Sequence, residues 1–145
     1  MNFLRIIVII TSLWIVSGCV PQVKLTFQCD DNVNEDMLLP VDIILVSQSE
    51  EKAILQLGPD AWFESEYRNN LTKEQLIKLA LKGKEKKEIM VNVPQKESAA
   101  IIFADYTQIT DQNLQQIIIC HHDWRKYKQG YIRVGEHGLQ IMKKW

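Results

Sequence analysis

Residues 40–46 read Pro-Val-Asp-Ile-Ile-Leu-Val, a short run rich in β-branched side chains that follows a proline. Such a run is typical of a buried strand, because branched side chains pack well on a pleated surface. Before it, residues 23–29 (Val-Lys-Leu-Thr-Phe-Gln-Cys) alternate apolar and polar side chains, which is the pattern of a half-buried strand. After it, five further segments have the composition of strands: 89–93, 98–106, 114–120, 131–134 and 139–142.

Between the second and third of these strands, residues 48–82 have helical signals instead. Ser47 and Glu50 match a capping box, which predicts a helix start, and Gly58-Pro59 predicts a helix end. A second capping pattern, Thr72-Lys73-Glu74-Gln75, precedes another apolar segment and predicts one more helical piece. Between them lies a stripe of side chains at helical spacing: Phe63, Tyr67 and Leu71.

The order of these elements predicts the architecture. Two strands, a helical insertion over about residues 48–82 and five strands joined by turns favour an antiparallel β-sandwich, so the fold class is mainly β. Gly135-Glu136-His137-Gly138 lies between the last two strands and indicates a β-hairpin. Trp62 and Phe63 are expected to pin the insertion to the sheet, and an exposed aromatic anchor for a partner is the alternative.

The N-terminus has the features of a lipoprotein signal peptide. Arg5 precedes an apolar segment, residues 6–16, that is shorter than the roughly 20 residues needed to span a bilayer. Val16-Ser17-Gly18-Cys19 follows and resembles the lipobox of bacterial lipoproteins, in which the signal is cut before a diacylated cysteine. We therefore predict a signal peptide over 1–18, covalent lipid on Cys19 and a single periplasmic domain over 19–145. An ordinary signal peptide with a chance cysteine is the alternative.

Cys29 and Cys120 remain after Cys19 is assigned to lipid. They form an even pair in an oxidising compartment, so a disulfide between an early and a late strand is one possibility. Two unpaired, buried thiols are the other possibility. The sequence leaves both open, because it does not give the distance between the two Cα atoms.

Charge and motifs argue against catalysis and nucleic-acid binding. The 17 Lys+Arg and 18 Asp+Glu give a net charge of −1, which excludes a generally basic nucleic-acid binder. A Ser-x-x-Lys motif at residues 49–52 lacks the companion motifs of penicillin-recognising enzymes. Cys-His-His-Asp at 120–123 would place neighbouring side chains on opposite faces of a strand, and the acidic segment after residue 29 lacks the Gly and Glu of a calcium-binding loop. We expect no enzyme activity, cofactor, metal or small-molecule substrate.

Three stretches, in this order, resemble a known family. They are residues 40–46, the segment Leu57-Gly58-Pro59-Asp60-Ala61-Trp62-Phe63 continuing to Arg68 and Leu71, and residues 99–106 (Ala-Ala-Ile-Ile-Phe-Ala-Asp-Tyr). Behind a lipobox, they resemble type VI secretion lipoproteins of the TssJ kind. The resemblance covers about residues 16–106 and implies a transthyretin-like β-sandwich with a small helical addition.

The resemblance also implies a function. Such proteins sit on the inner leaflet of the outer membrane, and Val20 after the lipobox fits that location because Asp there would favour the inner membrane. They bind the periplasmic C-terminal part of the inner-membrane protein TssM and so tether a trans-envelope secretion complex. The family makes that contact with a loop between its first two strands, here residues 30–39. The candidate partner-binding residues are therefore Asp30, Asp31, Asn32, Asn34, Glu35 and Asp36.

A pilotin-type lipoprotein shares the anchor and the β-rich composition. Such a protein would escort a secretin, or another outer-membrane component of a secretion system, instead of holding a trans-envelope complex. The sequence leaves this alternative open.

Overall fold

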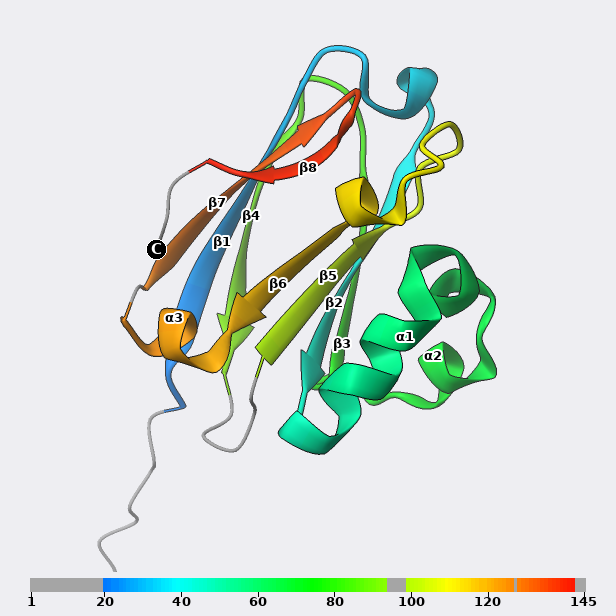
Figure 1. The fold of residues 1–145 in the computed structure, drawn as a ribbon. Helices are drawn as coiled ribbons and strands as arrows, with labels where there is room; N and C mark the ends of the chain where they lie inside the picture. The colour runs from blue at the N-terminus through cyan, green and yellow to red at the C-terminus, as the bar shows by residue number, and fades with distance from the viewer. Residues whose placement is uncertain (1–19, 94–98, 127, 143–145) are drawn as a thin grey trace, which may run out of the picture.

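Two four-stranded sheets pack face to face in the computed structural model, which describes residues 20–93, 99–126 and 128–142 (Figure 1). The strand order is β4-β1-β7-β8 in one sheet and β3-β2-β5-β6 in the other. The strands are β1 (Gln22–Cys29), β2 (Leu39–Val46), β3 (Leu76–Leu81), β4 (Lys86–Asn92), β5 (Ala99–Ala104), β6 (Gln116–Cys120), β7 (Gln129–Gly135) and β8 (Gly138–Ile141). The helices are α1 (Gln48–Glu64), α2 (Glu66–Asn70) and α3 (His121–Lys126), with short 3-10 turns η1 (Val33–Asp36) and η2 (Gln112–Gln115). The predicted signal peptide and Cys19 lie outside the described residues.

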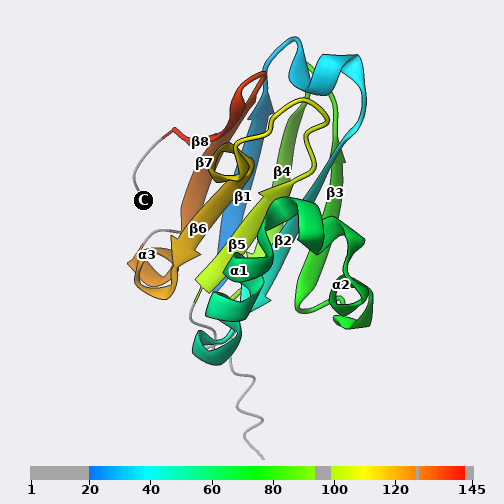
Figure 2. The same ribbon diagram turned by 45° about the vertical axis from the view of Figure 1, so that its right-hand side comes forward.

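The alternation predicted for the first strand fixes its place in the core. Val23, Leu25 and Phe27 of β1 are buried between the sheets, where they meet Val41 and Ile43 of β2 in one apolar cluster. The other face of β2 belongs to a second cluster, formed with α1 and β5: Ile44, Val46, Ile54, Trp62, Leu76, Ala99, Ile101 and Phe103. The sheet that contains β2 is therefore buried on both faces, and Figure 2 shows α1 lying across β5 and β2. The β-sandwich fold is confirmed.

The helical insertion is shorter than predicted. Helices occupy residues 48–70 only, and residues 76–81 form β3, which pairs antiparallel with β2 so that Ile77 faces Ile43. The capping pattern is present in part, since the Thr72 N–H donates to Gln75 Oε1 at 3.4 Å. The prediction of a further helix after residue 72 is wrong. The capping pattern closes a single turn, and pairing with the edge of β2 overrides the helical preference of the residues that follow.

Three local predictions in the insertion are confirmed. The Glu50 carboxylate accepts hydrogen bonds from the Ser47 N–H at 3.1 Å and from its hydroxyl, which caps α1. Gly58 has a positive φ of 68° and bends the helical segment, and a side chain there would meet Gln112 Oε1 at 2.2 Å. Trp62 is fully buried against Phe103, so it pins the insertion to the sheet as expected.

The sheet order differs from a purely antiparallel sandwich in one pair. β1 and β7 are parallel, with Leu25 opposite Gly130, because α3 returns the chain to the end of the sandwich at which β1 begins. The predicted hairpin is confirmed: Gly135 and Gly138 face each other across a two-residue turn. Gly138 has φ +121°, and any side chain there would clash with the Leu114 carbonyl oxygen.

The disulfide is not formed in this structure, since both Cys29 and Cys120 are free thiols. The topology gives the reason. Cys29 ends β1 opposite Val134, near the far end of β7, whereas Cys120 ends β6 beside α3, at the end where β7 begins. The two cysteines therefore lie in different sheets and at opposite ends of the sandwich. Cys29 is buried, as the unpaired alternative expected, but Cys120 is exposed.

Candidate functional site

The strand ends divide the sandwich into two poles. We call the pole that contains α3 and the start of β1 the α3 end. We call the opposite pole the loop end, which contains the β1–β2 loop (residues 30–38), the β3–β4 turn, the β5–β6 segment and the β7–β8 turn (Figure 1). The predicted partner-binding loop is the first of these four connections.

The side chain of Asn34 attaches the β1–β2 loop to neighbouring parts of the chain. Asn34 is buried, and its Oδ1 accepts hydrogen bonds from the N–H and the hydroxyl of Thr107 at 3.0 and 3.1 Å. Its Nδ2 donates to the Leu38 carbonyl at 3.1 Å. Left-handed backbone angles at Asn34, Glu35 and Asp36 make the tight turn that allows these contacts. The loop is therefore attached to the β5–β6 segment and is built as a fixed shape.

Two apolar side chains project from this fixed loop. Met37 and Leu38 are 47% and 62% exposed, immediately before Leu39 enters the core with no exposure. Large exposed apolar side chains on a rigid loop are suited to filling pockets on a partner. The sequence analysis proposed six Asp, Asn and Glu residues of the loop as the partner contact and missed this pair, although Met-Leu-Leu between an acidic run and a proline was a visible signal.

The base of the loop is tied to the first sheet by an ion pair. Asp30 accepts two parallel hydrogen bonds from Arg133 of β7, with Nε–Oδ1 2.9 Å and Nη2–Oδ2 2.8 Å. The Asp30 N–H also donates to the Val134 carbonyl, and the Lys84 N–H donates to the Asp30 carbonyl. Asp30 thus positions the loop.

A small cavity of about 280 Å³ lies beside the loop, between the β5–β6 segment and the β7–β8 turn. Asn32 and Glu35 line one side of it, and Glu136 and His137 line the other. Tyr106 also lines the cavity, and its hydroxyl donates to the Gly135 carbonyl at 3.0 Å. Burial, with the nearby charges of Cys29 and Asp30, raises the pKa of Tyr106 well above its ordinary value. The tyrosine is therefore a neutral structural donor.

The six candidate residues of the loop have different roles. Asp30 and Asn34 are structural, and Asp31 lies 3.5 Å from Lys84 on the exposed side of the loop. Asn32 and Glu35 line the cavity, and Asp36 directly precedes Met37 in the chain. Among the described residues, no group of three or more His, Cys, Asp or Glu side chains could hold a metal ion. No helix in the same residues is long and apolar enough to cross a membrane.

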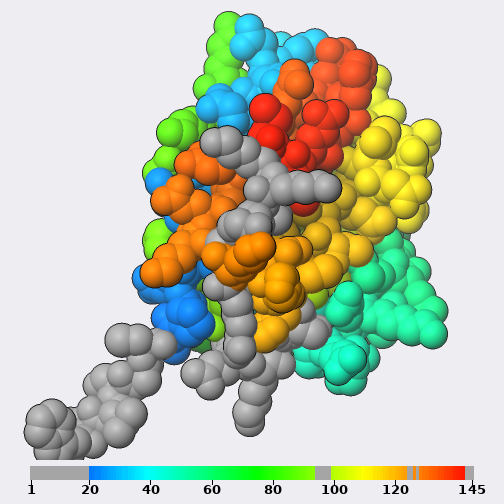
Figure 3. Space-filling view, turned by 60° about the vertical axis from the view of Figure 1, so that its left-hand side comes forward, coloured from blue at the N-terminus to red at the C-terminus, as the bar shows by residue number. Residues whose placement is uncertain are grey.

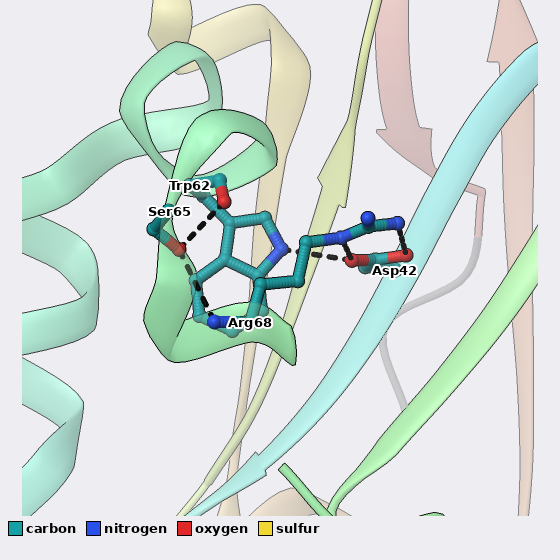
Figure 4. Close-up of polar contacts among 4 residues, drawn as sticks. All are labelled: Asp42, Trp62, Ser65 and Arg68. Carbon is teal, nitrogen blue, oxygen red and sulfur yellow. Dashed lines mark hydrogen bonds and ion pairs between the residues drawn. The ribbon is translucent and has the colours of Figure 1, made fainter. Parts of the chain in front are cut away.

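A second polar cluster, which sequence reasoning did not single out, joins the insertion to the sheet. Asp42 is fully buried on β2 and accepts hydrogen bonds from Trp62 Nε1 at 2.9 Å, Arg68 Nε at 2.5 Å and Arg68 Nη2 at 3.1 Å (Figure 4). The hydrogen bond to Asp42 raises the pKa of Arg68 further. A carboxylate inside an apolar strand was the signal, because buried charges require partners.

The neighbours of Arg68 support this cluster. The Arg68 guanidinium lies 5.1 Å from the centre of the Phe63 ring. The Ser65 hydroxyl accepts the Arg68 N–H at 3.2 Å and donates to the Trp62 carbonyl at 2.8 Å, which starts α2. Asp42, Trp62 and Arg68 come from the stretches that carry the family resemblance, so this contact explains why those stretches occur together in one fold.

The fold matches those of solved type VI secretion proteins. A chain of a type VI membrane complex matches with a TM-score of 0.72 and 9% identity, over 86% of this chain and 99% of that one. The type VI lipoprotein TssJ1 from Pseudomonas aeruginosa matches with a TM-score of 0.65 and 12% identity, over 83% and 94%. A chain of the structure described as the C-terminal domain of the type VI protein TssM from EAEC matches with a TM-score of 0.67 and 10% identity, over 84% and 98%.

No protein-family model and no curated protein sequence matches the chain. At these identities, the structural similarities establish the fold. The predicted resemblance is confirmed at that level: the chain has the fold of TssJ-like type VI lipoproteins.

Proposed function

We propose that this chain is an outer-membrane lipoprotein that tethers a type VI-like secretion complex by binding the periplasmic part of a TssM-like inner-membrane protein. The observation that carries the proposal is the polarity of the sandwich. The start of β1, next to the predicted lipidation site, and the rigid β1–β2 loop lie at opposite ends. The eight residues of β1 separate them by ~26 Å at about 3.3 Å per residue.

This polarity suits a tether. Two or more acyl chains on Cys19 would hold the α3 end stably at the inner leaflet of the outer membrane. The loop end would then face the periplasm, where an inner-membrane partner can reach it. The solved type VI structures with this fold, among them one described by a TssM domain, support this assignment.

The loop also suggests what the partner surface is like. Met37 and Leu38 would fill an apolar depression, because they are the exposed large apolar side chains of the loop. Glu35 and Asp36 lie beside them in the chain, so cations around that depression would match the loop in charge. Because Asn34 holds the loop in a fixed conformation, little conformational entropy is lost on binding.

Binding of the double variant Met37→Glu/Leu38→Glu to the purified periplasmic part of a TssM-like protein tests the loop. We expect affinity to fall at least tenfold, since a hot-spot side chain is worth about 2 kcal/mol or more. The matched control is Met90→Glu, an equally exposed methionine on β4, which should bind normally. Unchanged binding of the double variant would contradict the loop as the contact. Capture of a secretin C-terminus instead of the inner-membrane partner would favour the pilotin alternative.

Membrane fractionation of Cys19→Ser tests the anchor. The variant keeps the domain but loses the acyl chains, so it should leave the outer-membrane fraction and secretion should fail. Continued outer-membrane association of this variant would rule out lipid on Cys19 as the anchor.

A further inference from the structure

Cations gather at the α3 end, close to the start of β1. The Lys128 carbonyl accepts the Lys24 N–H at 2.9 Å, so the segment that follows α3 lies directly against β1. Lys126 and Lys128 are exposed. The α3 sequence also contains one carboxylate, Asp123, which reduces the net positive charge there. Figures 1, 2 and 3 agree that α3 and the start of β1 share one end of the molecule.

The chain between the predicted lipid and the folded body is very short. Only Val20 separates Cys19 from Pro21, and the Pro21 carbonyl already accepts the Val93 N–H at 2.8 Å. Two residues span at most ~7 Å, which is less than the Debye length of about 8 Å at physiological ionic strength. Lipid on Cys19 would therefore bring the α3 end into electrostatic contact with the headgroup layer, with no flexible linker to hold it away.

A denser group of lysines, around the β3–β4 turn, lies at the other end. Lys82 and Lys84 border the β3–β4 turn at the loop end. That cluster is therefore remote from a membrane that holds Cys19. The lysines placed to meet headgroups are those beside α3.

The opposite side of the same end is acidic. Val46 of β2 pairs with Ala99, which pairs with Cys120, so α1 begins at the α3 end as well. Its first turn contains Glu50 and Glu51. An anionic membrane surface would attract the α3 side of this end and repel the α1 side. The molecule would therefore tilt on the membrane so that α3 lies nearer to it than the start of α1.

We infer that the α3 end is a second, non-covalent membrane contact, in which Lys126 and Lys128 bind the phosphates of anionic phospholipid headgroups. This inference rests on the lipidation of Cys19 proposed above. The acyl chains hold the protein at the membrane, and the lysine contact stops it from rotating about them. The β1–β2 loop is thereby given a defined direction into the periplasm, which shortens the search for its partner.

The chain supplies a probe position for the test. Cys120 is an exposed free thiol next to α3, whereas Cys29 is buried. Burial raises the pKa of the Cys29 thiol to about 11, with smaller contributions from the charges of Glu85 and Asp30. Little of its reactive thiolate therefore forms. With Cys19 occupied by lipid, a thiol-reactive fluorophore labels Cys120 selectively.

In the experiment, the lipidated and labelled protein is reconstituted into two kinds of vesicle that contain a headgroup-attached quencher. One kind contains phosphatidylethanolamine with phosphatidylglycerol, and the other has phosphatidylcholine in place of phosphatidylglycerol. We expect strong quenching in the anionic vesicles, weak quenching in the neutral ones, and loss of the difference at high salt. Co-flotation of the protein with the vesicles is recorded separately.

Matched variants locate the contact. Each lysine near an anionic surface contributes about fivefold to the equilibrium constant between the membrane-contacting and the free orientation of the α3 end. Lys126→Glu/Lys128→Glu should therefore reduce that constant at least roughly tenfold, and Lys126→Gln/Lys128→Gln should reduce it less. Lys82→Glu/Lys84→Glu makes the same charge change at the loop end and should leave quenching unchanged.

The contact and the anchor fail in different ways. Equal quenching in both kinds of vesicle, or equal quenching in both charge-reversal variants, would overturn the lysine contact while co-flotation shows that the acyl anchor is intact. Loss of co-flotation from the protein with unaltered lysines would contradict the anchor itself, and the lysine contact with it.

Discussion

Two aspartate–arginine pairs in this molecule have nearly the same geometry and very different surroundings. Asp42 and Arg68 form two parallel hydrogen bonds between the sheet and the helical insertion, and so do Asp30 and Arg133 between the β1–β2 loop and β7. The side chains of the first pair are 1% and 20% exposed, and those of the second are 32% and 46% exposed. The comparison separates what an ion pair does in the core from what it does at the surface.

The difference lies in what remains when one partner is lost. A buried pair adds little net stability, because desolvation offsets the attraction, but removing one partner leaves an uncompensated charge. A surface pair leaves only a solvated side chain and is screened by salt. We therefore expect the first pair to determine whether the helical insertion stays on the sheet, and the second to contribute little to the position of the loop, whose base is also held by backbone hydrogen bonds.

The largest effect is expected for Asp42→Asn. The substitution leaves the largely buried Arg68 guanidinium without a counter-charge, and the free energy of unfolding should fall by about 3–5 kcal/mol. Equilibrium urea unfolding of the lipid-free chain measures it. The double variant Asp42→Asn/Arg68→Met should recover part of this loss, because it removes the orphaned charge. A loss below about 1 kcal/mol would show that water reaches the pair.

The second-largest loss of stability is expected for Trp62→Phe. The substitution removes the Nε1 hydrogen bond to Asp42 and part of a ring that packs on Phe103, so it should cost about 1–3 kcal/mol. Tyr67→Phe is the matched control, since it removes an exposed hydroxyl bond to Glu50 and should change stability by less than about 0.5 kcal/mol. Equal costs in urea unfolding would contradict a special role for the buried carboxylate.

The sequence predicts the parts of this fold that local patterns report. The period-two alternation of residues 23–29 follows from one buried face, and Ser47 with Glu50 is a local cap, so both predictions hold. Residues 76–81 show where this fails. Their capping signal is real but closes one turn, and the free edge of β2, which is distant in the sequence, determines that the segment pairs as a strand.

The site was predicted less well, because it depends on spatial relations. The sequence located the loop and placed Asn34 among six polar candidates for partner contact, whereas in the structure Asn34 fixes the loop through a partner 73 positions away. Asp42 within an apolar strand indicated a buried charge, but no local sequence pattern identified Arg68 as its partner. Whether Cys29 and Cys120 could pair depended on whether the ends of β1 and β6 lie at the same end of the sandwich. The parallel pairing of β1 with β7 shows that they do not, and no local sequence pattern reports that pairing.

The pH dependence of Asp105→Asn tests the charge around the buried pair. Burial, with the negative charges of Asp60, Asp42 and Glu64, raises the pKa of Asp105, and Arg68 lowers it. A raised folded-state pKa disfavours the charged form, so stability falls as the pH rises from about 4 through the folded-state value. The variant should therefore be modestly more stable than the parent at pH 7 and equal to it below about pH 4. Urea unfolding at both pH values checks this, and a variant less stable at pH 7 would contradict it.

The smallest effect is expected for Asp30→Asn, which makes the same chemical change as Asp42→Asn in the exposed pair. Arg133 stays solvated when its partner is neutralised, so the cost should be below about 1 kcal/mol and should shrink further at high salt. The backbone bonds from Asp30 to Val134 and Lys84 survive the substitution, so the loop should keep its place and the partner affinity should change little. The two Asp→Asn variants, measured side by side by urea unfolding, isolate burial as the variable because the substitution and the paired residue type are identical. A cost for Asp30→Asn close to that for Asp42→Asn would mean that the difference in exposure does not govern the two pairs, and that the loop depends on its ion pair as strongly as the helical insertion does.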